Sequence, residues 1–343
     1  MELEQFKYMI EAQDKIAQER EKRGLGEVTE KPKKKKIIGL SCGTKNGNCE
    51  FYLKAAAMGA AEFGVETEII RAIELRIKPC QGCGADVRAL AKGKLAICPI
   101  KDDDVPWILE KTVVEDCGLI VSVPVYYVRS NAIFMAICER MHPTMFNHLE
   151  ILKKRKVGAI ISVGGGLDGW TSLGLTSVNI WVQHHRTLVD QLQVETRDRD
   201  TNWFERAKEL GRNVARAMNI PIEEVKFMGE ESAVSCPVCH GDVMQMPDYR
   251  PRVLKPMELR YKPAHVVCPV CWVHGDLSFE GGKIKVKWDE WDVKHPRFSE
   301  YGVFEHLDML IRFFKEGIAD MDPYRELKKQ VSSYGKIIKP GKS

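Results

Sequence analysis

The sequence lacks any long apolar run and any marked excess of charge of one sign. None of its apolar stretches reaches the roughly eighteen residues that a membrane-spanning helix needs. Its 52 basic and 48 acidic residues leave a net charge of only +4, far from the basic field of a nucleic-acid-binding protein. The N-terminus is mixed in charge and has no signal-peptide core. We therefore expect a cytoplasmic protein with no membrane and no nucleic-acid partner.

What the chain does have is 11 cysteines, which in a cytoplasmic protein favour metal or redox chemistry over structural disulfides. Four of them form two Cys-Pro-Val-Cys pairs, Cys236 with Cys239 and Cys268 with Cys271. Two such pairs separated by a loop predict four thiolates around one tetrahedral metal ion. Zinc is the leading candidate, because His240 and Trp272 stand where a rubredoxin knuckle usually has glycine. Iron stays open, since both metals accept this ligand set.

From Lys36 onward the chain alternates between apolar strands and amphipathic helices. Strands are expected at 37–41, 65–70, 119–123, 157–163 and 187–194, and helices at 50–63, 104–117, 131–141, 171–185 and 202–218. Pro124 is expected to end the third strand. Five strands alternating with helices predict a doubly wound parallel sheet of the α/β class, with helices on both faces.

The character of the chain changes after Pro221, where the alternation stops. A hairpin is expected around Gly281-Gly282, a closing helix at 301–318, and an amphipathic N-terminal helix at 1–23 whose packing partner the sequence leaves open. The sequence thus predicts three parts: an N-terminal helix with a basic linker (1–35), an α/β domain (36–225), and a small four-cysteine domain with a C-terminal helix (226–343).

Three loops follow strands whose carboxyl ends should meet at one edge of the sheet, where ligands bind at a reversal of strand order. The first loop, 41–49, combines glycines with a helix N-terminus, which suits an anion. The second, 124–130, carries two tyrosines that can border a planar ring. The third, 164–170, begins with three glycines, which suit close backbone approach to a ligand.

These loops resemble those of the NADPH-dependent FMN reductase family, in particular its iron–sulfur flavoprotein branch. The matching segments are 45–48, 77–83, 100–103, 124–127, Glu139-Arg140 and 164–166. The resemblance implies a flavodoxin-like fold, FMN as cofactor, and a homodimer or homotetramer. The FMN contacts that it implies are Ser41, Cys42, Thr44, Lys45, Asn46, Gly47, Asn48, Cys49, Pro124, Val125, Tyr126, Tyr127, Gly164, Gly165 and Gly166.

The chain departs from the family's pattern in the first loop. Cys42 stands where the family usually has Ser, Thr44 where it has a basic residue, and Cys49 where it has Thr. A thiol is a weaker hydrogen-bond partner for phosphate than a hydroxyl, and the missing cation removes a charge-assisted contact. These departures predict weaker FMN binding.

Iron–sulfur flavoproteins carry a compact run of four cysteines after the second strand. This chain has Cys80 and Cys83, then Asp86 at the third position and Cys98 after a longer insertion. Three thiolates and a carboxylate are one ligand set for an iron–sulfur cluster, although four cysteines are usual. The alternatives are a vestigial or redox-active dithiol and a site for another metal that includes a cysteine from elsewhere in the chain.

The resemblance implies an FMN-dependent oxidoreductase that takes electrons from NAD(P)H or a protein donor and passes them to a small-molecule or protein acceptor. Because the flavin carries out the chemistry and the protein mainly binds and orients it, no single catalytic side chain is expected. Two alternatives stay open: an iron–sulfur flavoprotein that carries electrons to a partner enzyme, and a redox sensor built on thiols and zinc.

Overall fold

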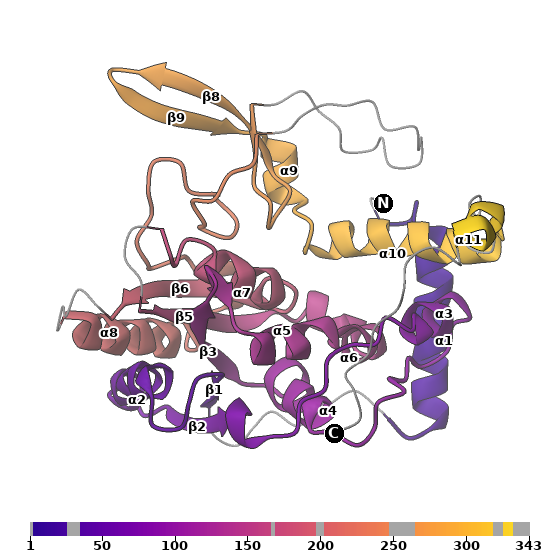
Figure 1. The fold of residues 1–343 in the computed structure, drawn as a ribbon, viewed down its shortest axis with the longest axis horizontal. Coiled ribbons are helices and arrows are strands. Elements are labelled where there is room, and N and C mark those ends of the chain that lie inside the picture. Colours follow the sequence, from indigo (N-terminus) through magenta and orange to yellow (C-terminus); the bar gives the residue numbers. More distant parts are fainter. Residues whose placement is uncertain are drawn as a thin grey trace.

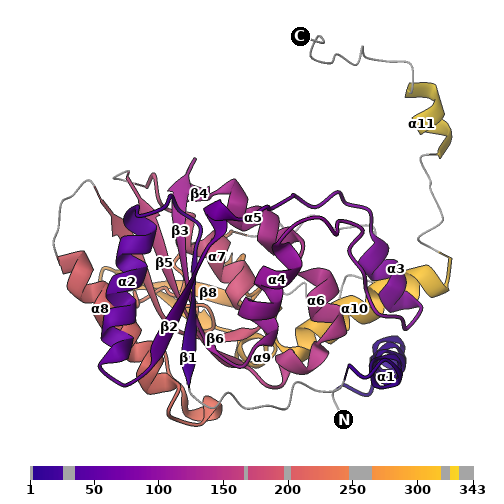
Figure 2. The ribbon, with the colours of Figure 1, turned by 90° about the horizontal axis from the view of Figure 1, so that it is seen from below.

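A parallel sheet lies at the centre of the molecule, between two layers of helices (Figures 1 and 2). This computed structural model describes residues 3–25, 35–165, 169–196, 202–246, 265–317 and 325–331. The strands are β1 (Lys36–Ser41), β2 (Glu66–Arg71), β3 (Gly118–Tyr126), β5 (Lys156–Gly164) and β6 (Arg186–Glu195), and the short β4 (Arg129–Ser130) pairs antiparallel with β3. The strand order β2-β1-β3-β5-β6 confirms the predicted doubly wound, flavodoxin-like sheet.

Each face of the sheet is covered by its own helices, as Figure 2 shows. One face packs against α2 (Asn48–Ala61) and α8 (Asn202–Ala217). The other packs against α4 (Val105–Leu109), α5 (Ala132–Glu139), α6 (His142–Asn147) and α7 (Gly174–Val182). Ile37 belongs to the first core and its neighbour Ile38 to the second, since successive strand residues point to opposite faces. Burial on both faces explains why the strands read as continuous apolar runs.

The N-terminal helix α1 (Lys7–Lys22) packs against α10 (Glu300–Lys315) and α3 (Ala85–Ala91), at the right of Figure 1. The Met9 N–H donates to Asp308 Oδ1 at 2.8 Å, and Arg20 pairs with Glu150 at 3.0 Å. The partner that the sequence left open is therefore a helix near the other end of the same chain. A last helix, α11 (Arg325–Val331), follows α10. The division of the chain at residues 35 and 225 stays a prediction.

A small second sheet is formed by β7 (Val266–Val267), β8 (His274–Glu280) and β9 (Lys283–Trp288), followed by α9 (Glu290–Lys294). The predicted β8–β9 hairpin is confirmed, and its turn residues Gly281 and Gly282 have φ of 59° and 76°, as a type I′ turn requires. Upstream, the Met228 N–H donates to Val189 O of the edge strand β6 at 2.7 Å. The chain after α8 therefore caps an otherwise open sheet edge.

The prediction that Pro124 ends the third strand was wrong, because β3 continues to Tyr126. The carbonyl of Ser122 accepts the Cys42 N–H at 2.9 Å, on the β1 side of β3. Pro124, two residues on, directs its backbone groups to the same side, where β1 has already ended. The missing N–H of proline therefore costs the sheet no hydrogen bond.

Several predicted helix boundaries were also wrong. The helix expected at 104–117 is α4 followed by a π-helical turn over Glu110–Val114, and the one expected at 171–185 shortens to α7. The helix after β1 begins at Asn48 and has Gly47 at its N-cap. The helix expected at 301–318 ends at Lys315, and Ile318 lies outside the described residues.

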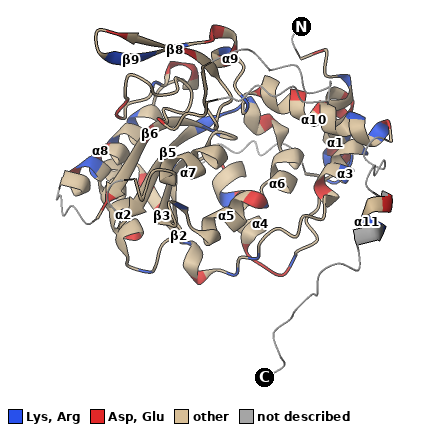
Figure 3. Cartoon of the chain, turned by 45° about the horizontal axis from the view of Figure 1, so that its top comes forward, with Lys and Arg blue, Asp and Glu red and all other residues tan. Residues whose placement is uncertain are grey.

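No helix in the described part of the chain is long and apolar enough to cross a membrane. Figure 3 shows acidic and basic residues interspersed along the helices, as the nearly balanced numbers of the two kinds lead one to expect.

The crossing of α2 and α8 gives a test of this packing. A Cβ at Gly211 would lie 1.8 Å from the Ala56 carbonyl oxygen. Helix propensity alone would favour Gly211→Ala by about 1 kcal/mol, but overpacking against a backbone that has no room to move costs about 1–3 kcal/mol or more. We expect Gly211→Ala to lower the free energy of unfolding by about 1–2 kcal/mol in denaturant titrations. The exposed Glu205→Ala in the same helix should change it by less than about 0.5 kcal/mol, and a stabilised Gly211→Ala would contradict the packing.

Candidate functional site

The strand order reverses between β1 and β3, and both strands end at the same edge of the sheet. Beside the Cys42–Ser122 bond, Asn131 Nδ2 donates to the Cys42 carbonyl at 2.8 Å. Ser122 Oγ donates to the Cys49 carbonyl at 2.9 Å. These buried bonds join the loop after β1, the start of α2 and the hairpin after β3 into one rigid unit.

The loop after β1 turns tightly into α2. Thr44, Lys45, Asn46 and Asn48 are exposed, whereas Ser41, Cys42 and Cys49 are buried. A Cβ at Gly47 would lie 2.3 Å from Thr44 Oγ1, so only glycine allows the loop to close this far. No side chain caps α2 at Gly47, and uncapped amides at a helix N-terminus attract anions. The predicted loop therefore presents a cradle that suits a phosphate.

The two thiols of this loop lie beneath it. Burial raises the pKa of the Cys49 thiol to about 12 and raises that of Cys42 as well, so both stay protonated and behave as small buried groups. The Cys42 N–H already donates to Ser122. The backbone of Cys49 belongs to the first turn of α2, whereas its side chain is buried.

An ion pair beneath the loop was missed by the sequence reasoning. Glu50, 1% exposed, accepts two hydrogen bonds from Arg71 at 2.9 Å and one from the Asn46 N–H at 3.0 Å. Hydrogen bonds from Arg71 and Lys54 hold the pKa of Glu50 well below its usual range. The bond to Asn46, whose φ is 56°, fixes the tip of the loop. Arg71 and Lys54 therefore neutralise the carboxylate of Glu50, which would otherwise repel a phosphate.

The two predicted tyrosines stand on a strained hairpin between β3 and β4. Tyr127 and Val128 have φ of 51° and 72°, the type I′ geometry that normally requires Asn or Gly. Tyr127 is 95% exposed and Tyr126 56%. The Leu173 N–H donates to Val128 O at 3.1 Å and holds the hairpin against the start of α7. Strain that is maintained by surrounding contacts beside exposed aromatic rings is typical of a ligand-binding edge.

The remaining predicted flavin residues lie close to this hairpin. Pro124 and Val125 form the end of β3, and Val125 pairs with Ser130 of β4. Gly164 ends β5, and a Cβ there would lie 2.3 Å from Thr171 Cγ2. Gly165 is exposed, and Gly166 lies outside the described residues.

The four cysteines of the two knuckles come together and are all buried. Their sulfur atoms lie within 4.8 Å of one another, and Cys239 Sγ is 3.6 Å from Cys268 Sγ. Four sulfurs bound to one zinc at about 2.3 Å would be about 3.8 Å apart. Hydrogen bonds from Cys236, Cys239 and Cys271 hold the pKa of the Cys268 thiol well below its usual range. The donor set therefore fits a single tetrahedral ion.

The two knuckles have the same backbone pattern. The His240 N–H donates to Cys236 O and the Trp272 N–H to Cys268 O, both at 2.8 Å. His240 and Trp272 have φ of 57° and 62°, which is the conformation that glycine adopts in a rubredoxin knuckle without strain. The non-glycine residues therefore do not change the geometry of the knuckle, and they give no reason to prefer zinc over iron.

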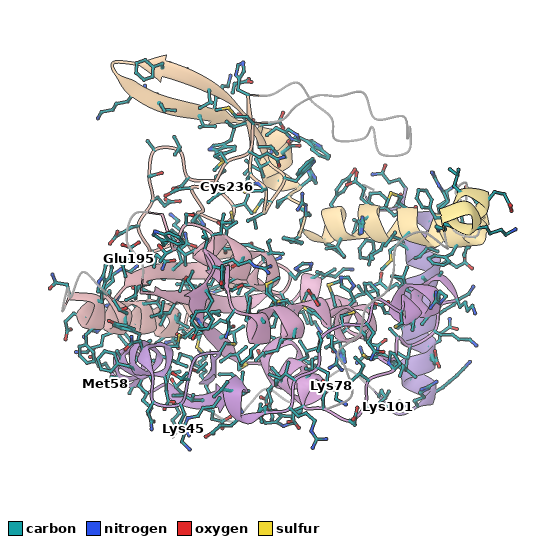
Figure 4. The ribbon with its side chains drawn as sticks, viewed as in Figure 1. Lys45, Met58, Lys78, Lys101, Glu195 and Cys236 are labelled. Carbon is teal, nitrogen blue, oxygen red and sulfur yellow. The ribbon has the colours of Figure 1, made fainter. Side chains whose placement is uncertain are left out.

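The first knuckle is docked on the edge of the main sheet, above β6 in Figure 4, where Cys236 is labelled. Gln191 Nε2 of β6 donates to His240 O at 2.6 Å. From α7, Asn179 Nδ2 donates to Cys239 O and Gln183 Nε2 to Val238 O, both at 3.4 Å. Three side-chain amides of the α/β domain thus hold the carbonyls of the knuckle.

The structure does not gather the other candidate cysteines in the same way. Among described residues, the two knuckles supply the only group of three or more metal-binding side chains. Cys80 and Cys83 are exposed, and Cys98 Sγ accepts a hydrogen bond from Arg140 at 3.5 Å. Asp86 pairs with His142 at 3.4 Å. An iron–sulfur cluster at Cys80, Cys83 and Cys98 therefore stays a prediction.

Comparisons with known proteins agree with this architecture. Residues 35–197 match the family model described as NADPH-dependent FMN reductase. The chain is 34% identical to an iron–sulfur flavoprotein of Methanosarcina thermophila over 155 residues. This aligned region covers 45% of this chain and 76% of that protein. An iron–sulfur flavoprotein of Methanocaldococcus jannaschii is 30% identical over 155 residues, covering 45% and 75%.

Among solved structures, a flavone reductase superposes with a TM-score of 0.67 at 22% identity, over 89% of this chain and 100% of that one. At this identity the match concerns the fold, and it extends beyond the α/β domain.

Metal content gives a test of the knuckle site. We expect the purified chain to carry one zinc or iron ion, Cys239→Ser to lose it, and Cys80→Ser, at an exposed cysteine outside the knuckles, to retain it. Elemental analysis after gel filtration measures this. Loss of metal from Cys80→Ser with retention in Cys239→Ser would contradict the assignment and favour the exposed cysteine loop.

Proposed function

The chain belongs to the NADPH-dependent FMN reductase family, on its iron–sulfur flavoprotein branch, and from this premise we propose that it is an FMN-dependent oxidoreductase that takes electrons from NAD(P)H or a protein donor. The observation that carries the proposal is the edge where β1 and β3 end, because a glycine-bearing loop, a helix N-terminus and an exposed aromatic hairpin meet there. FMN, when bound, supplies a ring that accepts electrons singly or in pairs.

The loop after β1 holds the phosphate of FMN. The amides at the start of α2 donate to its oxygens, and Thr44, Asn46 and Asn48 surround it from the exposed side. Lys45, paired with Glu74 at 2.8 Å, contributes a cation at the mouth of the loop. This arrangement compensates for the basic residue that is missing at Thr44 and for the thiols that replace hydroxyls.

The hairpin and the loop after β5 border the flavin ring. Tyr126 and Tyr127 exclude water from one side and present aromatic faces to the ring or to the second substrate. The exposed backbone of Gly165 lies against the ring, whereas the Cβ position of its buried neighbour Gly164 is filled by Thr171. No acid–base side chain is required of the chain for this role.

The four knuckle cysteines hold zinc or iron. Zinc would stabilise the small domain and its docking on β6, whereas iron in the same ligand set would add an electron relay. The exposed Cys80 and Cys83 favour a second candidate function, an electron carrier or thiol redox sensor that meets a protein partner at this loop. We expect a homodimer or homotetramer in either case.

Anaerobic reduction of the FMN-loaded chain tests the donor. Bleaching of the flavin absorbance within seconds of NADPH addition supports the oxidoreductase. Reduction by a reduced ferredoxin alone supports the electron carrier, and reduction by neither would contradict both. Reversible release of the metal on oxidation would instead support the sensor.

The strained hairpin generates a prediction that separates stability from binding. Replacing Tyr127-Val128 by Asn-Gly removes the positive-φ strain and should raise the free energy of unfolding by about 1–2 kcal/mol. The same change removes an aromatic face and should weaken FMN binding about fivefold in fluorescence titrations. Val128→Gly alone is the matched control, since it relieves strain while Tyr127 is kept. Unchanged FMN affinity in the double variant would contradict the role of Tyr127.

A further inference from the structure

A cavity of about 860 Å³ lies between the α/β domain and the four-cysteine module. Its walls come from the residues before β5, the start of β6, the segment 225–231, the two knuckles and the segment 293–300. This volume is in the range of small-molecule sites, which commonly form where two structural units meet.

The cavity is separate from the flavin edge. Thr187 and Leu188 line it, and they pair with Val157 and Gly158 at the amino ends of β6 and β5. The loops proposed to hold FMN follow the carboxyl ends of the strands. A ligand in the cavity therefore lies at the amino ends of the strands, opposite the carboxyl ends where FMN is proposed to bind, and is not the substrate of the flavin.

Much of the cavity wall is apolar and includes flat rings. Phe227 stacks on His240 with ring centroids 3.8 Å apart and an interplanar angle of 5°. Phe298 lies 3.9 Å from the ring of His184. Leu188 and Val238 extend this apolar surface. Such a wall favours a ligand with a planar apolar body.

The charged residues of the wall leave a positive excess. Three cations outnumber the two acids, Glu231, which shares a hydrogen bond with His240 at 2.5 Å, and Glu300, which pairs with Lys153 at 3.2 Å. The three lining cations, Arg155, Lys226 and Lys294, form no ion pair with any residue that the structure describes.

Arg155 is the innermost of these cations. Its guanidinium donates to three neutral carbonyls, Gln183 O at 2.7 Å, Phe298 O at 3.2 Å and Arg186 O. Burial, together with the charge of Arg186, lowers its pKa to about 10, so it remains charged at neutral pH. Arg155 is half-buried beside Cys271, and an anionic ligand in the cavity would add a charge-assisted partner to these neutral ones.

We propose that this cavity binds a small organic anion with a flat apolar body, such as an aromatic carboxylate or sulfonate. The anionic group pairs with Arg155, Lys226 and Lys294, while the ring packs between Phe227 and Phe298. Because Cys271 belongs to the same wall, the ligand bridges the α/β domain and the metal-binding module. Its binding therefore reports on, and stabilises, the docking of that module.

The experiment uses the full chain saturated with FMN and metal, so that the flavin edge is occupied. Anilinonaphthalene sulfonate is the anionic probe, and phenylnaphthylamine, which has the same rings without the sulfonate, is the neutral one. We expect saturable fluorescence enhancement with one sulfonate probe per chain, and about tenfold weaker binding of the neutral probe.

Matched charge reversals test the cations. Lys226→Glu with Lys294→Glu should weaken binding of the sulfonate about tenfold or more. Lys283→Glu with Lys287→Glu, on the exposed strand β9 outside the cavity, makes the same change in net charge and should leave binding within about twofold.

FMN affinity, measured in parallel, should be the same in both double variants. A chain that binds FMN but not the sulfonate probe contradicts the cavity proposal alone, whereas a chain that does not bind FMN contradicts the proposed function. Equal binding of the two probes, equal effects of the two double variants, or no saturable binding would each overturn the proposal.

Discussion

The hydrogen bond between Cys42 and Ser122, where β1 ends beside β3, is the constraint on which the rest of the site depends. Three buried bonds around it tie the loop after β1, the first turn of α2 and the start of α5 to one point. This junction coincides with the reversal of strand order, which is where ligands bind in sheets of this kind. Gly47 and the Glu50–Arg71 pair then fix the loop's shape and charge.

A second constraint acts at β6, the outermost strand of the sheet, whose free edge would otherwise have no hydrogen-bond partners. The Met228 N–H donates to Val189 O, and Gln191 Nε2 donates to His240 O of the first knuckle, so the metal-binding module covers part of that edge. Together with the start of β6, the module forms the cavity between the two units. Metal occupancy, docking of the module and the cavity are physically linked through Cys271 and the knuckle carbonyls.

Much of this architecture follows from local sequence, because apolar runs such as 37–40 and the two Cys-Pro-Val-Cys pairs carry their structure within a few residues. The features that were missed depend on distant partners. Pro124 is tolerated in β3 only because β1 stops at Ser41. Glu50 is buried because Arg71 reaches it from the end of β2, and the docking of α1 depends on Asp308 near the other end of the chain. Pairings of this kind have no periodic signal, so sequence reasoning gave the elements and the site's loops but not their supporting contacts.

The most direct test of the account compares the affinities of FMN and riboflavin for the flavin-free full chain by quenching of flavin fluorescence. The two ligands share the ring and differ in the phosphate, so their ratio isolates the loop after β1. The account predicts one FMN per chain, bound at least about tenfold more tightly than riboflavin. Equal affinities would contradict the phosphate cradle at Gly47 and α2, and the absence of binding by either flavin would contradict the central claim.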